Sequence, residues 1–214
     1  VLRGGAGGDV QIAAGTVSAA GAAPANRGGT GEATSRGGAV TVARGARLDA
    51  SGTGGGGTVQ LGGGATARVT VAGEATARGT GAGVRGGLVA AQAKDSVLVQ
   101  GGGKLDASGS AGGGTVMAGT TGLGRAQQMA ATTTIERGAE LRADATVSGP
   151  GGTVAVNSGA RSEMRGLLSA RGGPAGGDGG LVEISAMAAL EIDGRADVRA
   201  PLGLSLIHIS QGIV

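Results

Sequence analysis

The chain has 214 residues, of which 51 are glycine and four are proline. This composition excludes collagen, which needs glycine at every third position and abundant proline. The net charge of +3 comes from 18 basic and 15 acidic residues dispersed along the chain. Because there is no basic cluster and no Phe, Trp or Tyr on which bases could stack, we expect no nucleic-acid partner. A core without aromatic rings must be built from Val, Leu, Ile and Ala, which suits thin, regularly spaced layers.

Residues 1–36 form the first of three expected regions, a Gly/Ala-rich and irregular start of a repeat fold with one clear strand in "DVQIAA". The beginning "VLRGGAGGDV" lacks the charged and apolar regions of a signal peptide. No run of about 18 apolar residues exists, so we expect no transmembrane segment. The pattern starts and stops abruptly, which indicates a fragment of a longer protein.

Residues 37–203 form the second region, in which apolar and polar residues alternate in short stretches bounded by glycine pairs. Such alternation is typical of strands, and glycine pairs are typical of tight corners. Short strands and corners that return many times predict a β-solenoid, in which stacked coils share one apolar interior. The clearest strands are "AVTVAR", "TVQLGG", "RVTVAG", "GGTVAV", "LVEISA" and "LEIDG".

The phrase "LDASG" occurs at residues 48–52 and again at 105–109, each time before a glycine run and "TV". Alternation predicts that Leu and Ala of this phrase face inward. The residues predicted to face outward are Arg47, Asp49 and Ser51 in the first copy, and Lys104, Asp106 and Ser108 in the second. We interpret Asp49 and Asp106 as corner residues that accept hydrogen bonds from their own turns. The alternative is a row of carboxylates on the face of a polysaccharide-degrading enzyme.

The strand starts Thr58, Thr115, Thr153 and Leu181 are separated by 57, 38 and 28 residues. These intervals indicate coils of roughly 20–30 residues with some inserted loops or skipped corners. Residues 87–100 and 124–134 contain Ala, Gln, Lys and Met, which favour helix. Because their neighbours read as strands, we predict strand plus loop in both segments, with a short helical insertion as the alternative.

No residue is predicted to be catalytic, to bind a cofactor or to ligate a metal. The only histidine, His208, lies near the carboxyl end, and there is no cysteine nucleophile. Residues 81–86, "GAGVRG", match a dinucleotide-binding pattern, but such matches arise by chance among 51 glycines. The stretch "GGDGGLVEI" is faintly similar to a calcium-binding β-roll repeat, which would need to occur in tandem and here occurs once.

Residues 151–203 combine four phrases in a fixed order: "GGTVAV", "GLLSARGG", "GGDGGLVEIS" and "LEIDGRADVRAPLG". This order resembles the filamentous-haemagglutinin-like exoproteins of bacterial two-partner secretion. The resemblance implies an all-β fold, a right-handed parallel β-helix, and export by an outer-membrane two-partner-secretion transporter. It further implies a secreted, cell-surface adhesive stalk, not an enzyme, that binds host or bacterial surface receptors or glycans. A contact-dependent toxin exoprotein would use the same segment as a stalk.

Residues 204–214 form the third region, because "LSLIHIS" breaks the glycine-rich pattern abruptly. This stretch resembles the translation of a widely used sequencing-transposon end. We therefore expect a non-native tail, and the alternative is a final β-strand, which the apolar alternation also allows.

Overall fold

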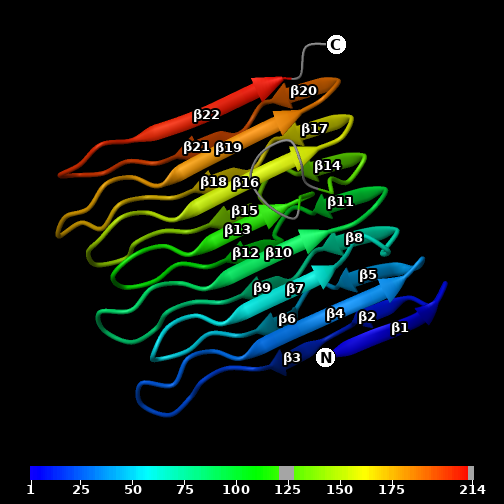
Figure 1. The fold of residues 1–214 in the computed structure, drawn as a ribbon, viewed down its shortest axis with the longest axis horizontal. Coiled ribbons are helices and arrows are strands. Elements are labelled where there is room, and N and C mark those ends of the chain that lie inside the picture. The colour runs from blue at the N-terminus through cyan, green and yellow to red at the C-terminus, as the bar shows by residue number, and fades with distance from the viewer. Residues whose placement is uncertain (121–127, 212–214) are drawn as a thin grey trace.

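The computed structural model describes residues 1–120 and 128–211, and in this part of the chain every regular element is a β-strand. The chain winds through three parallel sheets, and each coil adds one strand to each sheet (Figure 1). The coils stack in sequence order, with the first and last described strands at opposite ends of the stack. The predicted all-β fold, a parallel β-solenoid, is confirmed with about seven turns.

The first sheet has eight strands, all paired in parallel. In spatial order they are β1 (Leu2–Ala6), β4 (Thr30–Arg36), β7 (Thr58–Gly62), β10 (Leu88–Gln92), β13 (Thr115–Ala118), β16 (Thr153–Ser158), β19 (Leu181–Ala186) and β22 (Leu206–Gln211).

The second and third sheets have seven strands each. The second contains β2 (Val10–Ile12), β5 (Ala39–Val42), β8 (Arg68–Val71), β11 (Ser96–Val99), β14 (Thr132–Ile135), β17 (Arg161–Met164) and β20 (Ala189–Ile192). The third contains β3 (Gly15–Ser18), β6 (Ala46–Asp49), β9 (Glu74–Thr76), β12 (Lys104–Asp106), β15 (Glu140–Arg142), β18 (Leu167–Ser169) and β21 (Arg195–Asp197).

The register of the first sheet explains the uneven repeat interval. Leu88 pairs with both Thr58 and Thr115, so the interval of 57 residues between these threonines holds two coils. Residues 87–100 were predicted as strand plus loop but not as the start of a coil, because their composition favours helix. The interval of 38 residues from Thr115 to Thr153 is a single coil, whose extra residues lie between β13 and β14.

The two segments with helix-favouring composition have different outcomes. Residues 87–100 hold β10 and β11, which confirms strand plus loop and excludes the helical alternative there. Of residues 124–134, the first four lie outside the described residues, and the end overlaps β14. The first coil joins the same three sheets, and β22 pairs with β19 in parallel. The division of the chain at residues 36 and 203 and the non-native origin of the tail stay predictions.

The core consists of rows of identical or similar side chains that run along the stack. In the first sheet, one such row is Val59, Val89, Val116, Val154 and Val182, all fully buried. In the third sheet, Leu48, Leu105 and Leu141 occupy one inward row and are at most 1% exposed. Burial of each such side chain contributes about 1.5–3 kcal/mol, so a narrow aliphatic interior replaces the aromatic core of other folds.

The corner between the third and first sheets carries two rows of glycine. One row is Gly28, Gly56, Gly86, Gly113, Gly151 and Gly179, and the next is Gly29, Gly57, Gly87, Gly114, Gly152 and Gly180. A Cβ at Gly86 would overlap the carbonyl oxygen of Ala107, and one at Gly87 would overlap the carbonyl oxygen of Gly57. The glycine pair before each "TV" therefore reflects close approach of backbones within and between coils.

Candidate functional site

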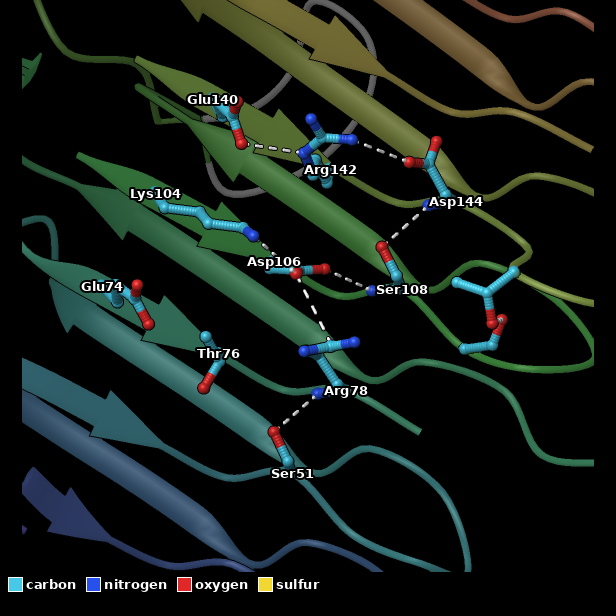
Figure 2. A network of polar contacts seen from close by, with 12 residues as sticks. Ser51, Glu74, Thr76, Arg78, Lys104, Asp106, Ser108, Glu140, Arg142 and Asp144 are labelled. Atoms are coloured by element: carbon cyan, nitrogen blue, oxygen red, sulfur yellow. Dashed lines mark hydrogen bonds and ion pairs between the residues drawn. The ribbon is translucent and has the colours of Figure 1, made fainter. Parts of the chain in front are cut away.

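The outer side of the third sheet is the most highly charged surface of the described chain, and we call it the charged face. Its residues leave the sheet in three neighbouring rows because alternate strand positions point outward. The rows are Arg47, Glu74, Lys104 and Glu140; then Asp49, Thr76, Asp106, Arg142, Ser169 and Asp197; then Ser51, Arg78, Ser108, Asp144, Arg171 and Arg199. Figure 2 shows the middle of this face.

Asp106 is the centre of one part of the network. One carboxylate oxygen accepts a hydrogen bond from the Ser108 N–H at 2.9 Å, and the other pairs with Lys104 Nζ at 3.4 Å and Arg78 Nε at 3.6 Å (Figure 2). The predicted corner role of Asp106 is thus confirmed. Its side chain lies on the outer side of the sheet as predicted, but it is only 4% exposed because the two cations cover it. Ser108 is buried as well.

Asp49 occupies the same row as Asp106, with Thr76 between them. Its Oδ1 accepts hydrogen bonds from the Ser51 N–H at 3.0 Å and from Thr76 Oγ1 at 2.7 Å, which confirms its predicted turn role. Burial raises the pKa of Asp49, but these hydrogen bonds and the Arg47 guanidinium outweigh it and hold the pKa below its usual value. The two aspartates lie two coils apart.

Asp144 is a second buried carboxylate of the charged face, and sequence analysis did not single it out. Its Oδ1 accepts hydrogen bonds from Ser169 Oγ at 2.6 Å and the Arg171 N–H at 2.8 Å. Its Oδ2 binds Arg171 at 3.2 Å and Arg142 at 3.3 Å. Arg142 also donates to Glu140 at 2.9 Å, which raises the pKa of Arg142 and lowers that of Glu140. Within the described part of the chain, the buried Arg171 Nε has no hydrogen-bond partner.

These contacts favour a structural role for the carboxylates of the charged face. Asp197 is held by a two-pronged pair with Arg199, at 2.7 and 2.8 Å, and this hydrogen bonding lowers the pKa of Asp197. A general acid at neutral pH needs a raised pKa, so lowered values suit permanently ionised carboxylates that hold the turns and arginines of this face in place. The rows nevertheless bring carboxylates of successive coils to one face, together with arginines, as in the enzyme alternative.

The outer side of the second sheet carries a smaller ionic cluster. Glu163 and Glu191 lie side by side in register, and this places two like charges next to each other. Arg165 contacts both, at 3.0 Å and 2.7 Å, and Arg161 also bonds both carboxylates. Bonding by Arg165 lowers the pKa of Glu191. The two arginines thus offset the repulsion between the glutamates and connect β17 to β20.

The glycine corner forms an open groove of about 430 Å³ over three coils. Its floor is made of Gly28, Gly29, Gly56, Gly57, Gly86 and Gly87, with Thr30, Thr58 and Leu88 along one side. Arg27 lines the other side, and Arg85 lies in the same row two coils further along. Among the described residues, neither guanidinium has an ion-pair or hydrogen-bond partner. Sequence analysis missed this feature, because partner residues cannot be assigned from a dispersed set of arginines.

A second open pocket, of about 610 Å³, lies where the charged face meets the last corner. Arg171 and Arg199 line it together with Pro174, Pro201 and Ser205. Since Ser205 belongs to the stretch predicted to be non-native, this pocket carries no functional argument.

The remaining motifs of the sequence are not brought together. Residues 81–86 form a corner that leads into β10, so no helix follows the glycines as a dinucleotide site requires. His208 is exposed on β22, beside Glu183. In residues 1–120 and 128–211, no three acidic or histidine side chains are grouped as they would be around a metal ion. That same part of the chain holds no helix able to cross a membrane.

No protein-family model matches the chain, and a search of the curated proteins also gives no match. The coarser part of the resemblance, a parallel β-helix, is shown by the structure. The relation to filamentous-haemagglutinin-like exoproteins stays a prediction.

Proposed function

We propose that the chain is a structural and adhesive stalk segment of a large secreted bacterial surface protein. The observation that supports this is the continuity of the three sheets, each of which runs through the whole stack without a break. Parallel strands spaced 4.7–4.9 Å apart give the eight-stranded sheet a length of about 33 Å. Hydrogen bonds between the coils and the ion pairs of the charged face resist stretching and bending of such a stack.

The same proposal includes export through an outer-membrane two-partner-secretion transporter. It also includes binding of host or bacterial receptors or glycans. Antibodies against the chain are expected to label intact cells that produce it. Labelling only after permeabilisation would contradict surface exposure. Beads coated with the chain are expected to adhere to target cells better than beads coated with albumin. Equal adhesion would contradict the adhesive role, and a stalk that carries a toxin would then be favoured.

The aligned Asp and Arg rows of the charged face favour a second candidate, an enzyme that degrades polysaccharides. Incubation of the chain with polyuronates and analysis of the product size would distinguish the two. We expect no shortening of the polysaccharide, because Asp49, Glu140 and Asp197 all have lowered pKa values. Shortening that is lost in Asp106→Asn but kept in Glu74→Gln would instead support the enzyme.

A further inference from the structure

We propose that the glycine corner binds a linear acidic polysaccharide whose carboxylates are spaced one per disaccharide. This inference rests on the proposed adhesive function, for which it supplies a site and a class of ligand. The site consists of the groove floored by the two glycine rows, together with the guanidinium groups of Arg27 and Arg85 at its border.

The side chains of the two arginines have the same orientation. The row that contains them reads Arg27, Gly55, Arg85, Gly112, Pro150 and Asp178 from coil to coil. Arg27 lies across Gly55, so that a Cβ there would be 3.7 Å from Arg27 Nε. Arg85 lies across Gly112, where a Cβ would be 2.9 Å from Arg85 Nε. Because Gly55 and Gly112 have no side chain, the side chains of Arg27 and Arg85 can extend along the axis over the following coil.

The spacing of the arginines selects the ligand. Two coils separate Arg27 from Arg85, which corresponds to about 10 Å along the stack. This distance is close to the length of one disaccharide unit in an extended polysaccharide. If every second sugar carries a carboxylate, two successive carboxylates therefore reach the guanidinium groups of Arg27 and Arg85, one each. A guanidinium group can bind a carboxylate through two parallel hydrogen bonds.

The free charge of these arginines distinguishes the corner from the charged face. There, Arg78, Arg142 and Arg171 are each paired with a buried aspartate. Arg27 and Arg85 are exposed and, within the described residues, unpaired, so their charge is available to an anion. The groove floor presents only backbone, which allows a chain of sugar rings to lie close to it. A single-stranded nucleic acid is disfavoured because the sequence has no aromatic side chain for base stacking.

The test is binding of fluorescent hyaluronan oligosaccharides to the 214-residue chain at low salt, with dextran of equal length as the neutral probe. We expect hyaluronan to bind and dextran not to bind. Arg27→Gln and Arg85→Gln should each weaken binding by roughly two- to fivefold, the range for an exposed charge pair. If the two arginines act independently, the loss of hyaluronan affinity in the double variant should equal the product of the losses in the two single variants.

The matched control is Arg68→Gln on β8, which removes one exposed charge that has no partner among the described residues and lies away from the groove. An unchanged affinity in this variant would support the site, and an equal loss would overturn it in favour of net charge alone. Tighter binding of a single-stranded oligothymidine than of hyaluronan would also overturn it. If the double variant keeps hyaluronan affinity, this site is wrong. If it loses hyaluronan but coated beads still adhere, the site is supported and adhesion involves a further surface.

Discussion

Replacement of Gly86 by alanine tests whether the glycine rows are required for coil stacking. The added Cβ would overlap the carbonyl oxygen of Ala107 and lie 2.9 Å from the Gly114 nitrogen. These two atoms form the 2.8 Å hydrogen bond that closes the corner of the next coil. We expect about 1–3 kcal/mol for overpacking. A further ~1–3 kcal/mol is expected if the buried carbonyl loses its partner. A loss of this size is a large part of a total stability of about 5–15 kcal/mol.

The assay is urea denaturation followed by far-UV circular dichroism, with two matched variants. Gly63→Ala adds a Cβ with no atom of the described residues within 4 Å, so it should leave stability unchanged or raise it by about 0.4–1 kcal/mol. Gly29→Ala lies in a glycine row but in the first coil, where the nearest atom is the Ala19 oxygen at 3.2 Å, so its effect should be intermediate. If Gly86→Ala were as stable as Gly63→Ala, the stacking explanation would be refuted. Failure of Gly86→Ala to fold would agree with it, and the order of the other two variants remains measurable.

Three further predictions concern the core and the charged face. Leu105→Ala should cost about 2–5 kcal/mol in urea denaturation, because the side chain is fully buried between neighbouring coils. A cost below that of an exposed Leu202→Ala would contradict the inward row. Asp106→Ala should cost about 1–3 kcal/mol, since it leaves the Ser108 N–H unpaired, whereas the half-exposed Glu74→Gln should change stability little. Equal effects would argue against the buried network. In the folded state, the pKa values of Asp49, Glu140 and Asp197 are below the ordinary pKa values of 3.8 for Asp and 4.5 for Glu. The stability that these carboxylates contribute is therefore fully present above the ordinary pKa values. It is lost as the pH falls through their lowered pKa values in the folded state. Thermal melts should therefore show a marked loss of stability below about pH 4, and a flat profile there would contradict it.

The sequence predicted the features of the fold that depend on neighbouring residues. Alternation placed Leu48 and Leu105 inside, and the Asp-Ala-Ser order predicted the turn bonds of Asp49 and Asp106, because both involve residues two positions apart. The burial of Asp106 was not predictable in this way. Its cover includes Arg78, which comes from the preceding coil and approaches only when the coils stack.

The same limit applies to the missed coil and the missed groove. Residues 87–100, whose composition favours helix, were predicted as strand plus loop, so Leu88 was not counted as the start of a coil, although the backbone register of β10 is the same as that of its neighbours. The glycine pairs were visible, but the reason for them is contact between backbones of adjacent coils. Likewise, the lack of partners at Arg27 and Arg85 among the described residues depends on which side chains the stacked coils bring near.

The glycine rows connect stability with the proposed binding site. A side chain at these positions would meet backbone of its own coil or of an adjacent coil, so stacking alone requires a floor without side chains. The groove is then a consequence of the solenoid, and any chain with such corners would present one. Selectivity must therefore come from the row beside the floor, where arginine and glycine alternate for four coils before Pro150 and Asp178 follow. For this reason, substitutions of Arg27 and Arg85 should change ligand affinity without changing stability, whereas substitutions of the floor should change both.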